Sequence, residues 1–211
     1  MSLSLPSFPL NLVVYPGEKL RLYIFELRYR QLIRECLEHE TTFVIPTVLD
    51  KSIAELATEV KIVSLDKDFP SGEMNITTEG IGRVRIREFQ TVAAGKLYPA
   101  SFIERLDTTE EAVPELQLEV FEMTRELHHL LGVADKLPES PDDLRAFELG
   151  HHVGMNLRQE YNLLTLEGER ERLIAIKNHI KKILPIVIET ERLKSRAKLN
   201  GHFKNLIPPH F

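Results

Sequence analysis

The hydrophobic pattern of this chain changes its period once, and this change constrains the fold more than any other feature. Before about residue 107, apolar and polar residues alternate in short runs; in residues 19–24, for example, Leu20, Leu22 and Ile24 share one face. After about residue 112, apolar residues recur at three- and four-residue steps. A period of two is typical of half-buried strands, and a period near 3.6 is typical of amphipathic helices. The sequence therefore predicts an α+β protein with its strands first.

The front part combines short strand signals with one helix. Pro16-Gly17 and Pro70-Ser71-Gly72 are turn sequences, because Pro presets φ and Gly accepts positive values. A helix is expected where apolar residues, including Cys36, recur at helical spacing between residues 29 and 37. Strands are expected at residues 8–14, 19–24, 43–45, 60–65, 74–78, 83–87 and 97–104. Many short strands with glycine turns predict a small, strongly bent sheet or pseudo-barrel.

The rear part carries helix start and stop signals. Gly132 is expected to cap a helix in the left-handed conformation, and Asn156 with Gln159 predicts the start of another. A long helix should begin at Glu169, and Pro185 should kink or end it before helical spacing resumes. The expected units are a β subdomain over residues 1–110, a helical bundle over 111–198 and an apolar, irregular tail over 199–211.

Composition and charge narrow the setting. The only cysteine, Cys36, excludes an intrachain disulfide, fits a reducing cytoplasm and is expected to be a small core residue. No signal peptide is recognised, and no apolar run approaches the ~20 residues that a membrane helix needs. Residues 177–211 hold eight basic and two acidic side chains, so this end carries +6 and the rest −11, for a net charge of −5. A basic end can dock on the acidic body, pair with a second copy, bind a polyanion or remain solvated.

The sequence lacks the catalytic motifs of P-loop ATPases, serine hydrolases and zinc hydrolases, so we predict no enzyme activity, no cofactor and no catalytic residue. Gly95-Lys96 lacks the rest of a P-loop, and neither a Gly-x-Ser-x-Gly elbow nor a His-Glu-x-x-His zinc helix occurs. Glu148 lies at helical spacing from His151 and His152, which leaves a metal-dependent hydrolase at Glu148 and His152 as an alternative. The interpretation we favour is packed or surface histidines and no metal site.

A set of motifs runs along most of the chain: Phe8-Pro9-Leu10, Pro16-Gly17, Leu20, Leu22, Ile24-Phe25-Glu26, Arg28-Tyr29, Thr58-Glu59-Val60-Lys61-Ile62, Pro70-Ser71-Gly72, Gly80, Arg83-Val84-Arg85-Ile86, Leu144-Arg145-Ala146-Phe147 and Glu171-Arg172-Leu173. Together these motifs resemble one known family, the amino-terminal domain of Lon proteases. The resemblance is most specific near the start and covers the chain to about residue 184. Ala57 departs from the family, which often has Gly there.

The resemblance implies a PUA-like pseudo-barrel, a C-terminal helical bundle and contact with unfolded or degron-bearing polypeptides. The sequence has no room for the family's ATPase and protease domains, so we expect a non-enzymatic binding or adaptor module that serves a separate ATPase or protease. Phe25, Arg28 and Tyr29 are the candidate polypeptide-binding residues. Arg28 and Tyr29 are expected to reach the surface, whereas most of the motif is expected to determine the fold.

An RNA-binding PUA-like module is the alternative function. Arg83, Arg85 and Arg87 alternate along one predicted strand and would project from one face toward phosphates. The basic C-terminal helix offers a second polyanion site at Lys194, Arg196 and Lys198. The acidic body and the lack of interleaved aromatic residues favour a solvated or acid-paired face instead, so nucleic acid is not the expected partner. The apolar tail with Phe203, Leu206, Ile207 and Phe211 could fold back or join two copies.

Overall fold

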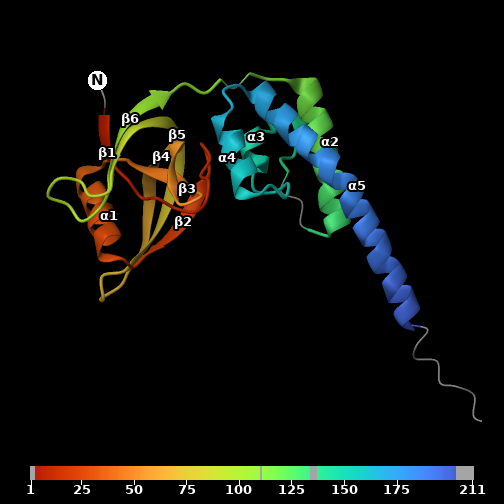
Figure 1. Cartoon of the computed structure of the whole chain (residues 1–211), viewed down its shortest axis with the longest axis horizontal. Helices are drawn as coiled ribbons and strands as arrows, with labels where there is room; N and C mark the ends of the chain where they lie inside the picture. The colour runs from red at the N-terminus through yellow and green to blue at the C-terminus, as the bar shows by residue number, and fades with distance from the viewer. Residues whose placement is uncertain (1–2, 110, 134–136, 203–211) are drawn as a thin grey trace, which may run out of the picture.

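The computed structural model describes residues 3–109, 111–133 and 137–202, with side chains up to residue 196, and confirms the α+β class. The strands and helix α1 form the N-terminal part of the chain, and the remaining helices form the C-terminal part (Figure 1). The elements in chain order are β1 (Leu3–Pro6), β2 (Lys19–Ile24), α1 (Leu27–His39), β3 (Phe43–Leu49), β4 (Ser52–Asp68), β5 (Met74–Gln90), β6 (Ala100–Leu106), α2 (Pro114–Leu131), the 3-10 turn η1 (Pro141–Asp143), α3 (Ala146–Leu149), α4 (Leu157–Thr165) and α5 (Glu169–His202).

The strands form an antiparallel sheet that closes on itself. Its order is β1-β6-β5-β4-β3, and β2 also pairs with β5. The chain that follows β1 then runs parallel to β3: the Phe8 amide donates to the Val44 carbonyl at 2.8 Å, and the Val48 amide donates to the Leu10 carbonyl at 2.8 Å. This closure makes the expected pseudo-barrel. Helix α1 packs its apolar face, including the buried Cys36, into the barrel core.

Strand lengths differ from the sequence prediction. Residues 74–78 and 83–87 belong to one strand of 17 residues, β5, because Gly80 does not interrupt it. A side chain at Gly80 would overlap the carbonyl of Tyr15, so this glycine serves a close backbone approach rather than a turn. The strand expected at residues 8–14 is wrong; that segment follows β1 and makes only isolated bridges.

In the helical part, α2 and α5 run side by side in the same direction, and Lys177 Nζ on α5 lies 2.5 Å from Glu119 Oε2 on α2. The capping box of Asn156 with Gln159 and the left-handed Gly132 are confirmed. Pro185 does not end its helix. It lies on the exposed face of α5, where the carbonyl left without an amide partner can bind water.

Helix α5 continues to His202, so the irregular tail does not begin at residue 199 as expected. Residues 203–211, with the apolar side chains proposed to fold back or join copies, lie outside the described residues. The division into units 1–110 and 111–198 stays a prediction. Val13 and Tyr15, which belong to the first unit, pack in the core formed by the helices of the second. Within the described ranges, no helix is long and apolar enough to span a membrane.

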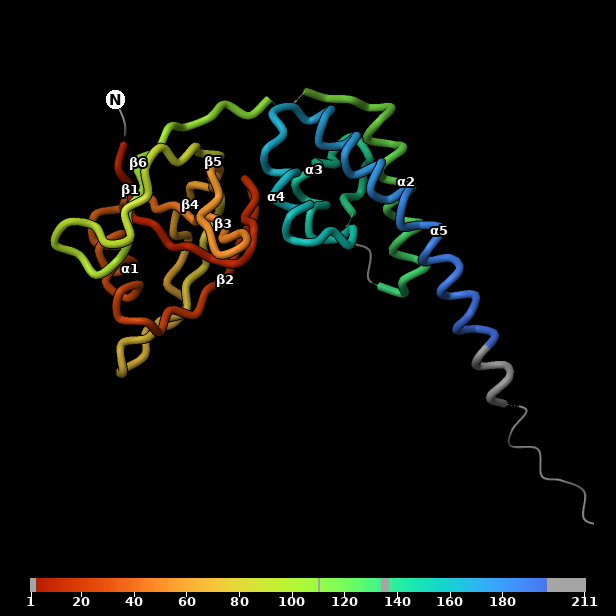
Figure 2. The backbone as a smooth tube through the Cα atoms, viewed as in Figure 1, coloured from red at the N-terminus to blue at the C-terminus, as the bar shows by residue number. Residues whose placement is uncertain are grey.

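Arg83 on β5 bridges the two parts of the chain instead of facing solvent. Its side chain is 1% exposed, and its guanidinium donates to the carbonyls of Leu164 and Leu166 at the end of α4, at 3.2 and 2.8 Å. It also donates to Asp107 O at 2.8 Å and to Thr108 Oγ1 at 3.2 Å in the linker between β6 and α2, which Figure 2 traces. The prediction that Arg83 lies on an open face is therefore wrong, because the helices cover that end of the barrel.

We predict that Arg83→Lys lowers the free energy of unfolding by about 2–4 kcal/mol, because an ammonium cannot replace four directed bonds and leaves buried carbonyls unpaired. Urea denaturation followed by circular dichroism measures this. The matched control is Arg87→Lys on the same strand. Arg87 forms an exposed ion pair with Glu104, so this variant should lower the free energy of unfolding by less than about 0.5 kcal/mol. Equal costs for the two variants would contradict the bridging role of Arg83.

Candidate functional site

Apolar side chains open to solvent gather where β2 passes into α1. Tyr23, Phe25 and Leu27 are 56%, 59% and 69% exposed, and the half-buried Phe69 in the β4–β5 turn completes the group. We call Tyr23, Phe25, Leu27 and Phe69 the aromatic surface. Figure 1 shows α1 and the β4–β5 turn on the side of the barrel away from the helices. Large apolar groups gathered in water are typical of contact sites.

Regular backbone structure positions the aromatic surface. Tyr23 pairs with Asn75 in the β2–β5 ladder and points away from the core face of Leu22 and Ile24. Its ring lies 5.9 Å from the Phe25 ring in a stacked arrangement and 6.2 Å from the Phe69 ring, edge to face. The rings therefore hold one another in place, which lowers the entropy lost when a partner binds.

The three sequence-predicted contact residues have different environments. Phe25 lies in the aromatic surface. Arg28 is exposed, but its Nη2 lies 2.8 Å from Glu26 Oε2 and its guanidinium covers the Tyr29 ring at 4.5 Å. Tyr29 is only 6% exposed and stacks on Phe8 with ring centroids 4.0 Å apart, so the prediction that it reaches the surface is wrong. Its place on α1 faces the barrel core.

Tyr23, Leu27 and Phe69 were missed by the sequence analysis. The alternation of residues 19–24 already placed Tyr23 opposite the core face, so this residue could have been found. Leu27 and Phe69 carry no such signal, because only the fold brings the start of α1 and the β4–β5 turn together.

A cleft lies between the barrel and the helices, with a cavity volume of about 1110 Å³. Apolar groups such as Leu20, Ile81 and Phe147 line it together with charged ones. Glu148 and His152, the alternative metal site, are among the lining residues. Over the described ranges, no group of three or more His, Cys, Asp or Glu side chains is placed to hold a metal ion.

His151 links the two sides of this cleft. Its Nε2 lies 3.2 Å from Glu18 Oε2 in the loop before β2, and its Nδ1 lies 3.0 Å from Glu160 Oε1 on α4. A neutral imidazole has a single N–H and cannot donate to both carboxylates, so this geometry fits the imidazolium. The bond to Glu18, aided by that to Glu160, raises the pKa of His151 to about 9.

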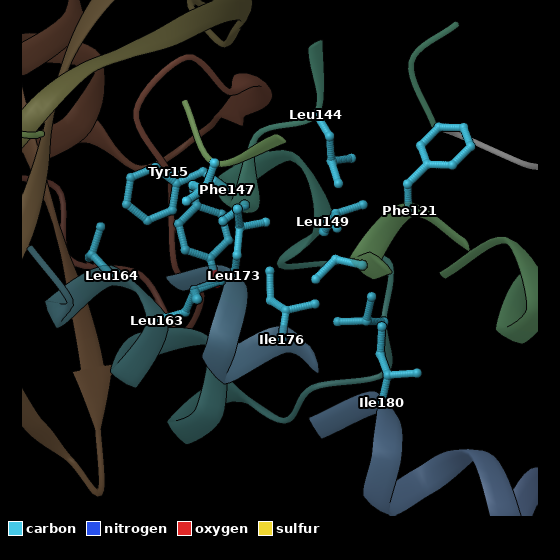
Figure 3. Packing of buried hydrophobic residues seen from close by; sticks show 14 of the residues in the cluster. Tyr15, Phe121, Leu144, Phe147, Leu149, Leu163, Leu164, Leu173, Ile176 and Ile180 are labelled. Carbon is cyan, nitrogen blue, oxygen red and sulfur yellow. The ribbon is translucent and has the colours of Figure 1, made fainter. Parts of the chain in front are cut away.

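Tyr15 fills the junction beneath His151. Its ring stacks on Phe147 at 5.0 Å and lies 4.8 Å from the His151 ring, and its hydroxyl donates to the Glu160 carbonyl at 3.0 Å. Figure 3 shows Tyr15 beside Phe147 in the helical core. A side chain at Gly150 would overlap the Tyr15 ring. The ionisable groups Glu18, His151 and Glu160 thus join the two parts of the chain.

The polyanion-binding residues of the alternative function do not form one site. Arg83 is buried, Arg85 Nε lies 3.0 Å from Glu55 Oε1, and Arg87 pairs with Glu104. On the end of α5, Lys194 and Arg196 are exposed, and Lys194 Nζ lies 2.7 Å from Glu191 Oε1. The side chain of Lys198 lies outside the described residues. RNA binding through this helix stays a prediction.

Comparison with known proteins identifies one family. Residues 4–182 match the ATP-dependent protease La (LON) substrate-binding domain. A Lon N-terminal domain protein from Xanthomonas campestris is similar in structure, with a TM-score of 0.64 and 25% identity over 81% of this chain and 95% of that one. The N-terminal domain of a Mycobacterium avium complex Lon protease shares the fold, with a TM-score of 0.60 and 16% identity over 84% and 98% of the two chains. No curated protein sequence gives a significant match.

We predict that His151→Gln lowers the free energy of unfolding by about 1–2 kcal/mol at pH 6. Folding raises the pKa of His151 above the ordinary value of 6.5, so its stabilisation is complete below pH 6.5 and disappears as the pH rises through about 9. Urea unfolding at pH 6 and pH 10 should show the difference between variant and wild type shrinking toward zero. His129→Gln, at an exposed site on α2, is the control. A difference that does not change with pH would rule out an imidazolium link.

Proposed function

Because the chain belongs to the Lon substrate-binding domain family, we propose that it binds unfolded or degron-bearing polypeptides through the aromatic surface and catalyses no reaction itself. The observation that carries the proposal is the exposure of Tyr23, Phe25 and Leu27 on the ends of rigid elements. Apolar groups held in water have a large free energy to gain from a partner.

The size and chemistry of the aromatic surface suit an unfolded client. An unfolded chain presents apolar side chains that a folded protein buries, so contact with Phe25 and Leu27 discriminates between the two. Burying one such side chain contributes about 1.5–3 kcal/mol, from which the cost of ordering the client must be subtracted. We therefore expect micromolar affinity for each site, which permits capture and release.

The edge of β2 offers a place for the client backbone. Among the strands of the described ranges, β2 is paired only with β5, which leaves its outer edge open beside Tyr23. An extended segment can donate and accept backbone hydrogen bonds along such an edge while its side chains contact the aromatic surface. This mode reads client sequence weakly, as a module for many clients requires. Arg28, exposed on the next turn, is a further proposed contact.

A non-catalytic binding module can act by bringing its bound client to another protein. We therefore propose that the chain is a cytoplasmic adaptor and that its partner is a separate ATPase or protease. The barrel and the helices offer different surfaces, so a client on the aromatic surface leaves α2 and α5 accessible to such a partner (Figure 1).

We predict that replacing both Phe25 and Leu27 with Ser weakens binding of a permanently unfolded casein by about tenfold or more, because two apolar contacts are lost. Fluorescence anisotropy of labelled casein measures the Kd. Thermal unfolding should be nearly unchanged, since both side chains are exposed. The matched control, Leu118→Ser, removes a 49% exposed side chain from α2 and should leave the Kd as it is.

Two results would contradict the proposal. The first is equal casein affinity for the wild type and the double variant. The second is hydrolysis of ATP or cleavage of casein by the purified chain, because the proposal assigns it no catalysis.

A further inference from the structure

A hollow lined by cations borders the aromatic surface along α1. Its volume is about 580 Å³, and it lies between α1 and the loop that joins β5 to β6. Three cationic side chains line it, Arg30, Arg34 and Lys96, and no carboxylate is among its lining residues. Leu27 and Leu97, 69% and 60% exposed, supply the apolar part of the lining, and Leu27 also belongs to the aromatic surface.

The three cations are engaged to different degrees by the protein itself. Lys96 Nζ lies 2.8 Å from Glu35 Oε2, and Arg34 Nη2 lies 3.4 Å from Asp68 Oδ1. Among the described residues, Arg30 makes no ion pair within 4 Å, and its Nε is buried without a hydrogen-bond acceptor. The nearest carboxylate in electrostatic terms is Glu73, whose pKa is lowered chiefly by the hydrogen bond from Ser71 and in part by Arg30. Because Nε is closed to solvent, an anion in the hollow would contact the terminal Nη groups of Arg30, which no ion pair in the described part of the chain engages.

The fold holds Arg30 in place beside the aromatic surface. Its guanidinium packs over Gly72 in the β4–β5 turn, where a side chain would overlap it, and Phe69 of the same turn belongs to the aromatic surface. On the other side of the hollow, the Leu97 amide donates to Gln31 Oε1 at 3.0 Å, and Gln31 Nε2 donates to Glu35 Oε1 at 2.9 Å. These bonds fix the β5–β6 loop, which carries Lys96, against α1, which carries Arg30 and Arg34.

We propose that this hollow binds an acidic side chain of the polypeptide client, so that the chain selects unfolded segments in which Asp or Glu adjoins apolar residues. The proposal rests on the proposed function and specifies its substrate class. A planar guanidinium presents donors that match both oxygens of a carboxylate, and the leucines of the lining contact the neighbouring apolar residues. The apolar contacts supply most of the affinity, and the carboxylate contact supplies the preference.

Two labelled peptides test the preference. Both are acetylated and amidated, share an apolar and aromatic sequence, and differ only in a central Glu or Gln. At low salt the wild type should bind the Glu peptide about fivefold more tightly than the Gln peptide, as expected for a partly exposed ion pair, and the ratio should fall as salt rises. Fluorescence anisotropy measures both Kd values.

Variants locate the effect. Arg30→Gln should bring the ratio of the two Kd values near one and leave the affinity for the Gln peptide unchanged. Arg34→Gln, at a more exposed site, should reduce the ratio in part, which keeps the test valid should Arg30→Gln fold poorly. Arg125→Gln on α2 removes an exposed arginine outside the hollow and should leave the ratio as it is. The Phe25 and Leu27 double variant should weaken both peptides alike.

Different failures have different meanings. Equal binding of the two peptides by the wild type overturns the carboxylate site and leaves the proposed function standing, whereas binding of neither peptide overturns both. A free C-terminal carboxylate on the Gln peptide that restores the full fivefold preference would show recognition of chain ends and overturn the acidic side-chain proposal. Displacement of the Glu peptide by an RNA oligonucleotide from the wild type, but not from Arg30→Gln, would also overturn the acidic side-chain proposal.

Discussion

The junction around Tyr15 is the constraint on which the arrangement of this molecule depends. A barrel this small and a short set of helices each leave an apolar face uncovered, and the two faces meet here. Tyr15 enters the helical core against Phe147, and His151 holds Glu18 of the front part and Glu160 of the rear. Arg83 completes the junction from β5. The Tyr15 ring requires a residue without a side chain at Gly150, and Arg83 requires the carbonyls at the end of α4, so these contacts fix how the parts fit together.

This junction also assigns different tasks to the two ends of the barrel. Polar groups at the end that faces the helices, such as Arg83 and Glu18, join the two parts of the chain. The opposite end carries the aromatic surface and the cationic hollow on α1, where nothing in the described chain covers them. One end of the barrel packs on the helices and the other is exposed. Under the proposed function, the exposed end binds a client while another surface contacts a partner.

Much of this fold could be predicted from the sequence, and the failures have physical causes. The change in hydrophobic period located the strands and helices, and local caps such as Asn156 with Gln159 were readable because they depend on neighbours in the chain. The strands expected at residues 74–78 and 83–87 are one strand, and Gly80 within it is explained by the close approach of Tyr15, which is far away in sequence. Arg83 and Arg85 alternate alike, yet tertiary packing buries the first and leaves the second beside Glu55. Burial on a closed barrel depends on what covers each end, and alternation does not encode that.

Binding of a client at the aromatic surface is tested most directly by a map of amide chemical shifts during titration with an unfolded casein. We predict progressive shifts for residues 23–31, 69–72 and 95–97, with α2 and α5 unaffected. A folded protein of similar size should produce none of these shifts. Shifts confined to α5 or to the cleft around His151, with the aromatic surface unchanged, would contradict client binding at the aromatic surface.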